Sequence, residues 1–281
     1  MEEYLIPMAW SAVYILETFL LLWLAKFAYV SLYRRVDLKR EIFDRRNYAL
    51  ATATTGYLFG VIVAFGGVLA GPSAGWKADL LGIALYGIVS IALLLVASFL
   101  SEKVLLPHFD NTREVVQDRN MGTAFVEAGM HIANGLIILA IVQGDGPWWI
   151  GLVFWGLAQI ILILVALLYE VSTRHSIHAE LERDNAAVGL AFCGALVGMG
   201  NIISLAVAGD FLGWKASLLG FASYAIFGLI MLQIVKRLTD MLLAPGVKLG
   251  KEQSDDQPSV GAGLFEAFGY VGASMLLVWA L

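Results

Sequence analysis

Residues 75–82 read GWKADLLG and residues 213–220 read GWKASLLG, so seven of eight residues recur 138 positions later. When the chain is shifted by 138 residues, about a third of positions 47–109 match positions 185–247 without a gap. This identity exceeds what a biased apolar composition gives by chance. The recurrence therefore predicts a tandem duplication of one unit.

The duplication continues beyond the ungapped match. With one inserted residue, GTAFVEA at 122–128 lies opposite GAGLFEA at 261–267. We therefore expect two domains, at residues 1–145 and 146–281, each holding one copy of the unit. The apolar segments that begin the two copies match each other only in hydropathy.

The composition places both copies in a membrane. Of the 281 residues, 59% are hydrophobic and 15% are charged, whereas soluble domains carry about 25% charged residues. Eight apolar segments are each long enough to cross a ~30 Å hydrocarbon core as a helix. They lie at about 6–33, 47–70, 78–100, 120–143, 147–170, 185–208, 216–236 and 259–281. We therefore expect the chain to be embedded in a lipid bilayer.

The predicted fold class is an all-α polytopic membrane protein, with eight transmembrane helices arranged as two parallel four-helix repeats. Dense Leu, Ile, Ala and Gly without polar alternation argues against barrel strands. Because four is an even number, both repeats have the same orientation, and parallel repeats are related by a pseudo-twofold axis along the membrane normal. We expect two four-helix bundles side by side.

The connections alternate between short glycine-rich turns and longer charged loops. Fifteen of the 18 Lys and Arg residues fall in or at the edges of the charged loops, and these residues concentrate on the cytoplasmic side. The bias predicts a bacterial inner-membrane protein with both termini on the outer, periplasmic side. Cysteines introduced at Ser73 and Asp145 should then react with an impermeant thiol reagent in intact cells. The acidic start MEEYLIP lacks the positive region of a cleaved signal, so we expect the first span to be retained.

Three glutamates fall inside the apolar segments, where an ionised side chain costs about 2.5–3.5 kcal/mol. Glu17 lies in the middle of the first segment, whereas Glu127 and Glu266 lie at matching positions in the last helix of each repeat. We expect the matching pair to face protein or water, near the axis that the two repeats share.

A polar stripe accompanies each glutamate of the matching pair. His131 and Asn134 follow Glu127 by four and seven residues, on the same helix face. Tyr270 follows Glu266 by four residues. Two interpretations stay open: a proton relay or cation pathway, or buried hydrogen bonds that join helices at roughly 0.6–2 kcal/mol each.

Two further sets of residues recur in both repeats. Trp suits the headgroup layer and Lys directs its ammonium group to water, so the recurring phrase predicts outer-interface anchors or an outer vestibule. Small residues four apart let helices approach closely. The anchors are Trp76, Lys77, Trp214 and Lys215, and the helix-packing glycines are Gly56, Gly60, Gly194 and Gly198.

The Gly-Trp-Lys turn, Asn-x-x-x-Gly-x-Ala at Asn185 and Phe-x-Glu-Ala at Phe125 resemble the YjfL-like family of bacterial inner-membrane proteins, also called domain of unknown function 350. The resemblance covers nearly the whole chain as two tandem copies. It implies an inner-membrane location and an association with membrane-stress and polyamine-related genes. It supplies no catalytic residues, since the family has no agreed activity.

We expect a channel or transporter for protons or a small cation. The alternative is a non-conducting membrane partner that recruits a cytoplasmic membrane-stress protein through its charged loops. No nucleophile–base set or nucleotide motif occurs, so we expect no enzyme, no cofactor and no nucleic-acid partner.

The charged loops could bind a metal ion or anionic lipid. His175, His178 and Glu180 are a chance cluster rather than a metal site. The basic run that includes Arg35, Arg40 and Arg45 suits anionic lipid at roughly 1 kcal/mol per residue, although the orientation bias explains it as well. A homo-oligomer is compatible with the sequence.

Overall fold

The computed structural model of the chain describes all residues except 1, 35, 105–109, 145 and 174–175. Arg35, Asp145 and His175 therefore lie outside the described residues. Among the residues that are described, eight helical segments are long and apolar enough to cross a membrane. This confirms the all-α membrane fold and the predicted spans.

The long helices end close to where the apolar runs end. They are α1 (Glu2–Ala28), α2 (Tyr48–Leu69), α3 (Trp76–Val104), α5 (Met121–Gln143), α6 (Trp148–Ser172), α8 (Ala186–Val207), α9 (Trp214–Leu238) and α11 (Val260–Ala280). Short α-helices and π-helical turns (η) occupy the charged connections: η1 (Tyr29–Arg34), η2 (Arg40–Asp44), α4 (Asn111–Arg113), η3 (Glu114–Asp118), α7 (Ile177–Glu182), η4 (Thr239–Leu243) and α10 (Leu249–Gln253).

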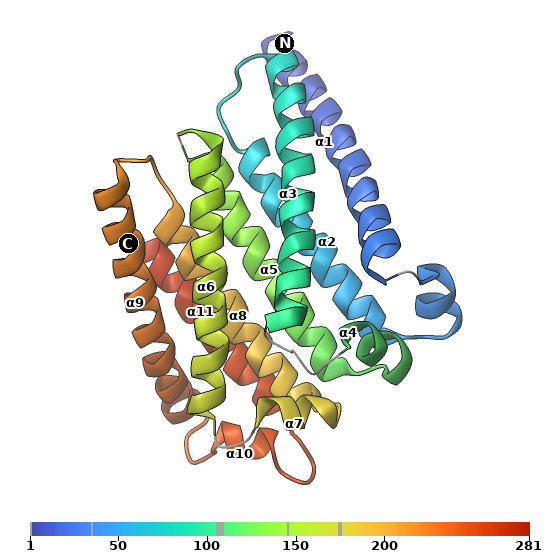
Figure 1. Cartoon of the computed structure of the whole chain (residues 1–281), viewed down its shortest axis with the longest axis vertical. Helices are drawn as coiled ribbons and strands as arrows, with labels where there is room; N and C mark the ends of the chain where they lie inside the picture. The colour runs from blue at the N-terminus through green and yellow to red at the C-terminus, as the bar shows by residue number, and fades with distance from the viewer. Residues whose placement is uncertain (1, 35, 105–109, 145, 174–175) are drawn as a thin grey trace.

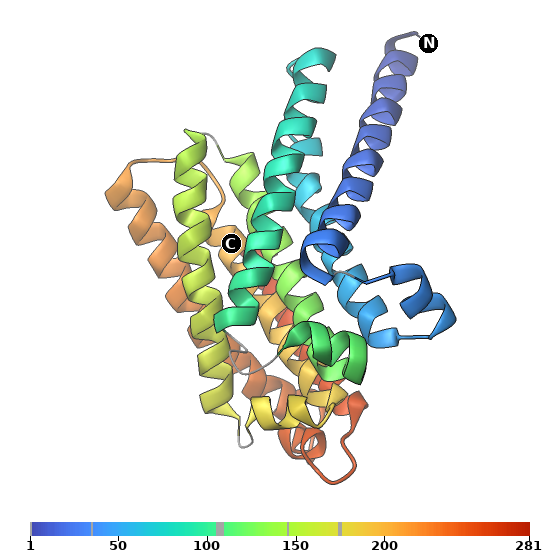
Figure 2. The ribbon, with the colours of Figure 1, turned by 45° about the vertical axis from the view of Figure 1, so that its right-hand side comes forward.

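Four long helices form a row in the order α2, α5, α8 and α11, which are the second and fourth helices of each repeat (Figure 1). All four begin at a charged connection, so they run in the same direction. The remaining helices form a second layer. In that layer α1 packs on α2 and α3, α3 bridges α2 and α5, α6 bridges α5 and α8, and α9 bridges α8 and α11 (Figure 2).

The expectation of two separate bundles related by a pseudo-twofold axis is wrong. A twofold axis exchanges α2 with α8 and α5 with α11, so it requires α11 to contact α2 as α5 contacts α8. The α5–α8 contact is as extensive as those within each repeat, whereas α2 and α11 lie at opposite ends of the row. The repeats are joined in line, and one type of interface is used three times.

Small residues explain this close packing. A Cβ atom added at Gly56 or Gly194 would overlap the backbone of the last row helix of the same repeat, at Ala128 or Ala267. Gly60 and Gly198 meet the carbonyls of His131 and Tyr270 in the same way. Both glycine pairs therefore lie inside their own repeat. Between the repeats, Gly129 lies directly against Cys193.

An asparagine begins each of the first three row helices and joins it to the next one. The side-chain oxygens of Asn47, Asn120 and Asn185 accept hydrogen bonds from the first turns of their helices. Their amide groups donate to carbonyls of the following connection, for example from Asn47 to Val115 at 3.0 Å and from Asn185 to Gln253 at 2.7 Å. We call these three residues the asparagine latches.

The last row helix begins differently. Ser259 caps α11 through its hydroxyl group, which accepts from the Ala262 N–H at 3.3 Å. At the second latch, Asn120 also donates to Glu114 at 3.0 Å. Burial raises the pKa of the Glu114 carboxyl, and the hydrogen bond from Asn120 opposes that rise. The charged connections are thus tied together at one end of the row.

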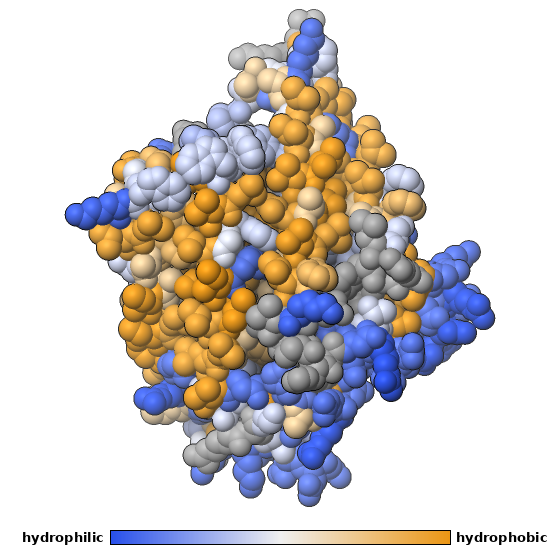
Figure 3. Space-filling model, viewed as in Figure 1, coloured by the Kyte–Doolittle hydropathy of each residue, from blue (hydrophilic) through white to orange (hydrophobic). Residues whose placement is uncertain are grey.

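The surface of the second layer carries an apolar belt across α3, α6 and α9 (Figure 3). Hydrophilic residues gather at the end where the charged connections lie. Large apolar side chains remain exposed in this belt, for example Leu81, Leu219 and Ile230. Such a belt is the surface that a bilayer covers.

Candidate functional site

The second repeat holds Glu266 inside the membrane-spanning part of α11, with 1% of its surface exposed. The Lys236 Nζ of α9 lies 3.8 Å from Glu266 Oε1. The Gln253 Nε2 of α10 donates a 2.6 Å hydrogen bond to Oε2. The carboxylate is therefore held between an ammonium group and an amide group.

Aromatic rings complete this arrangement. Lys236 Nζ lies 5.5 Å from the centre of the Tyr169 ring, within the range of a cation–π interaction. Tyr169 meets the edge of Tyr270 at 6.3 Å, and both hydroxyl groups lie beside Glu266. We call Glu266, Lys236, Gln253, Tyr169 and Tyr270 carboxylate site 2.

The first repeat holds Glu127 and His131 on α5, both buried. Ser98 Oγ of α3 lies 3.3 Å from His131 Nδ1, and the same hydroxyl donates to the Leu94 carbonyl at 2.8 Å. Because its proton is used for Leu94, the hydroxyl accepts from His131. This assigns a proton to Nδ1 and leaves Nε2 as the nitrogen whose protonation changes the ring charge.

Two stacked tyrosines line the other side of His131. The Tyr29 and Tyr57 rings are 4.3 Å apart, and the edge of each meets the imidazole ring, at 5.9 and 5.2 Å. We call Glu127, His131, Ser98, Tyr29 and Tyr57 carboxylate site 1. All five side chains are buried, so the site is a packed polar cluster.

The polar stripe on α5 ends one turn beyond site 1. Asn134 Oδ1 accepts a 2.7 Å hydrogen bond from Gln159 Nε2 of α6, and its own amide group donates to Met130. Further along the same face, Ile138 and Ile141 line an apolar cavity. The described polar contacts of the stripe thus stop near the middle of the span.

The two carboxylate sites correspond in part and lie apart. Ser98 and Lys236 are 138 positions apart, the same shift that relates the repeats; Tyr29 directly follows α1, and Tyr169 lies in the last turn of α6. The expectation that both glutamates lie near one shared axis is wrong, because α8 separates α5 from α11 in the row.

Sequence reasoning missed Lys236 and Gln253 as site residues. Lys236 was assigned to the edge of a charged loop, but α9 and η4 continue to Leu243 and place it inside the span. Its alignment with Ser98 was the available signal, since Ser98 lies in an apolar segment. Gln253 carried no such signal, because its connection has no recognisable pattern.

Glu17 belongs to neither carboxylate site. It is half-buried on α1, on the face that Tyr14 and Leu21 share. Tyr14 donates to Asp79 of α3 at 2.9 Å, and Leu21 packs at Gly87 of the same helix. Glu17 therefore lies toward α3.

The recurring phrase begins α3 and α9, where its tryptophans pack on the first helix of their repeat. Trp76 stacks on Trp10 at 4.8 Å, and Trp214 lies 5.8 Å from Trp149. Trp10 and Trp149 therefore correspond, although their helices align only in hydropathy. Lys77 Nζ lies 5.2 Å from the ring centre of the neighbouring Trp76. Lys215 is exposed at the matching position.

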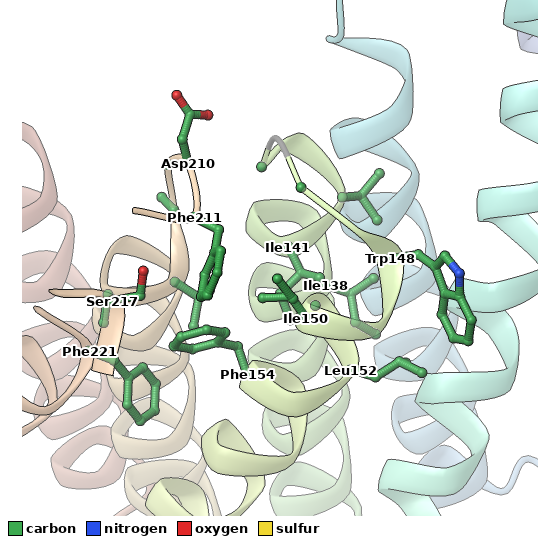
Figure 4. Close-up of a pocket in the computed structure, with 18 of the residues that line it drawn as sticks. Ile138, Ile141, Trp148, Ile150, Leu152, Phe154, Asp210, Phe211, Ser217 and Phe221 are labelled. Carbon is green, nitrogen blue, oxygen red and sulfur yellow. The ribbon is translucent and has the colours of Figure 1, made fainter. Parts of the chain in front are cut away.

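A cavity of about 910 Å³ surrounds the N-terminal end of α6 and is bounded by α3 and α9; we call it the outer pocket because it lies away from the end where the charged connections gather. Figure 4 shows Trp148 and Leu152 on the α3 side of α6. On the α9 side, Phe154, Phe211 and Phe221 converge, and the Asp210 carboxylate points away from them. Most of the lining is apolar, although the buried Ser90 belongs to it, and among the described residues Asp210 at the rim is the charged lining residue.

Comparison with known proteins places the chain among membrane proteins without an assigned activity. The sequence model described as Domain of Unknown Function (DUF350) matches residues 4–142 and again residues 147–281. The "UPF0719 transmembrane protein" of Aquifex aeolicus is 22% identical over 244 residues, 85% of this chain and 88% of that protein. The "UPF0719 transmembrane protein YshE" of Bacillus subtilis is 25% identical over 108 residues, 38% of this chain and 76% of that protein. No solved structure matches the chain.

Proposed function

The chain belongs to the family described as Domain of Unknown Function (DUF350), and from that premise we propose that it moves protons or a small cation across the membrane through carboxylate site 1. One observation carries the proposal. Glu127 and Glu266 correspond, but His131 follows Glu127 by one helical turn where Tyr270 follows Glu266, and Lys236 lies 3.8 Å from Glu266 where repeat 1 has Ser98. An ionisable residue inside a membrane marks a functional site by default.

The two sites differ in their capacity to change charge. In site 2 the Lys236 Nζ lies 3.8 Å from Glu266 Oε1, whereas the residues that define site 1 include His131 and neither a lysine nor an arginine. Histidine changes charge between about pH 5 and 8, and His131 lies one turn beyond Glu127 on the same helix face. Site 1 therefore suits a group that gains and loses a proton or cation during a cycle.

The polar stripe supports a direction for the pathway. Glu127, His131 and Asn134 span about 10 Å along α5 from the side of the charged connections. Beyond Asn134 the same face is apolar at Ile138 and Ile141, where the outer pocket begins. Transport requires this outer half to open, since an apolar passage does not hydrate a cation.

The test is a flux measurement in liposomes that contain the purified protein, with an imposed pH gradient. We expect Glu127→Gln to lower proton flux at least tenfold, and His131→Gln to shift its pH dependence. The matched control is Lys236→Met with Glu266→Gln, which removes both charges of site 2 together and should leave flux within about twofold. Equal flux from wild type and Glu127→Gln removes site 1 from any pathway.

The proposal includes an orientation in a bacterial inner membrane, with the charged connections in the cytoplasm and both termini outside. The test replaces Cys193 with alanine and introduces single cysteines at Ser73 and Asp255. The first should react with an impermeant thiol reagent in intact cells, and the second only after lysis. The reverse pattern inverts the orientation and the direction of the pathway.

A non-conducting role is the second candidate, and the asparagine latches favour it. They join the cytoplasmic connections into one surface, on which a cytoplasmic membrane-stress protein, anionic lipid or a second copy of the chain could dock. No enzymatic step is part of either proposal. Absent flux in every ion tested, together with loss of a captured cytoplasmic protein after Asn120→Ala, favours this role.

A further inference from the structure

We propose that the outer pocket is a binding site for one phospholipid with a zwitterionic, amine-bearing headgroup such as phosphoethanolamine. Its acyl chains would lie along α6, and the ammonium group of its headgroup would lie at the rim beside Asp210. This inference concerns the opposite end of the molecule from the carboxylate sites and does not depend on transport.

The lining of the pocket selects for hydrocarbon. Phe154, Phe211 and Phe221 meet on the α9 side of α6, and Leu152 with Trp148 lines the α3 side (Figure 4). A cavity of about 910 Å³ is within the range of ligand sites, and it lies within the membrane-spanning segments. At that depth the pocket is surrounded by lipid acyl chains, so acyl chains are the ligand most available to fill it.

Acyl chains alone give little preference for the pocket over the bilayer, because lipid tails are as apolar as the side chains that replace them. Retention of one lipid therefore depends on shape and on the headgroup. Asp210 lines the pocket at its rim, whereas Lys215 is exposed and is not among the lining residues. A carboxylate at the rim attracts the ammonium group of an amine-bearing headgroup and repels an anionic headgroup.

The first repeat provides an internal contrast. Pro72 stands where the second repeat has Asp210, and Asp79 stands where it has Ser217. Asp79 accepts hydrogen bonds from Tyr14 and Ser73, and Trp10 stacks on Trp76, so α1 closes against α3. The equivalent rim charge is absent there, and Lys77 and Gly82 do not line the pocket.

Two matched glycines test occupancy of the pocket. Gly220 lines it and Gly82 is its counterpart in repeat 1; both are half-buried with open space where a Cβ would be. Gly220→Phe should reduce retention of a phospholipid at least fivefold, whereas Gly82→Phe should not change it. The measurement is native mass spectrometry of purified protein equilibrated with equal amounts of phosphatidylethanolamine and phosphatidylglycerol of matched chains.

Charge variants test the headgroup and do not depend on Gly220→Phe folding. Wild type should retain phosphatidylethanolamine over phosphatidylglycerol by about fivefold, and Asp210→Asn should remove or reverse that preference. Lys215→Gln, which removes an exposed charge of α9 outside the pocket lining, is the control and should change the retention of neither lipid. Equal retention of the two headgroups by wild type, or equal loss from both glycine variants, overturns the proposal.

Discussion

Carboxylate sites 1 and 2 occupy the same place in two copies of one unit, yet they hold different charges. Glu127 and Glu266 correspond, but the first is followed one helical turn later by His131 and the second by Tyr270, and Lys236 Nζ lies 3.8 Å from Glu266 Oε1. Where α3 carries Ser98, α9 carries the lysine. The duplication has kept the carboxylate and changed the side chains around it.

The packing around the two sites changed together with the charge. Tyr57 of α2 stacks on Tyr29 in site 1, whereas the corresponding residue of α8 is Ala195. In site 2 Phe192 of α8, which stands where α2 has Thr54, stacks on Tyr169 with ring centres 4.9 Å apart, and Lys236 Nζ lies 5.5 Å from the centre of the same Tyr169 ring. The stacked ring therefore comes from positions one helical turn apart in the two repeats, and only site 2 adds a lysine. The comparison shows which residues both repeats share, and which residues around the carboxylate differ between them.

Breaking the ion pair of site 2 should have the largest effect. Lys236→Met leaves the Glu266 carboxylate, 1% exposed, without its cation, and removing one partner of a buried pair costs about 3–5 kcal/mol. We expect this loss in the free energy of unfolding, measured by denaturant titration in mild detergent.

Two controls accompany that measurement. Ser98→Ala, at the matching position of site 1, should cost about 1 kcal/mol, the value of one hydrogen bond. Lys236→Met combined with Glu266→Leu should recover most of the stability, because no unpaired charge remains. If the double variant is as unstable as Lys236→Met, the loss comes from packing and the ion pair is not its cause.

The second prediction concerns the helix packing at Gly56 and Gly194, which should be equally tight in the two repeats. Gly56→Ala and Gly194→Ala each drive a methyl group into the backbone of a neighbouring row helix, and overpacking of this kind costs about 1–3 kcal/mol. Thermal unfolding should show similar losses for the two variants. Gly82→Ala, which has open space at its Cβ, is the control and should be neutral or stabilising. A loss at only one of the two row glycines would show that the shared scaffold is not equally packed.

The sequence predicted the helices well because their causes are local. Apolar run length determined the eight spans, and Asn47, Asn120 and Asn185 mark helix starts by capping chemistry that a sequence displays. The arrangement of the repeats was not predictable in this way. Similarity between units does not say which faces meet, and the α5–α8 interface uses glycines of the same kind as the interfaces within each repeat.

The candidate sites were predicted in part for a similar reason. Glu127 and Glu266 were identified because a carboxylate in an apolar run is conspicuous. Their partners come from other helices, so Ser98, Tyr29 and Gln253 could be assigned only after the layers were known. Lys236 was hidden because a charge near the end of a span is read first as an orientation signal.

The third prediction converts one site into the other. Ser98→Lys with Tyr57→Ala gives site 1 the lysine and the small residue of site 2, so its carboxylate acquires a permanent cation. If titration of site 1 drives transport, proton flux in liposomes should fall at least tenfold while the protein remains folded. Tyr57→Ala alone is the control for the lost ring. Flux that survives the double substitution would show that a changeable charge at site 1 is unnecessary.

The asparagine latches should have the smallest effect on stability. The row helices begin with either an asparagine or a serine cap, and this difference shows how to separate the capping contribution from the link to the next connection. Ser259 caps α11 with a hydroxyl group, whereas Asn120 both caps α5 and donates to the Leu181 carbonyl of the next connection. Asn120→Ser should keep the cap and lose the donation, at about 1 kcal/mol of unfolding free energy. Asn120→Ala should lose the cap as well, at about 1 kcal/mol more. Because the latch joins successive connections, hydrogen exchange should rise in α7 for both variants but in the first turn of α5 only for the alanine variant. Equal exchange in the two variants would mean that capping alone holds the connections, and that the link along the row contributes no stability.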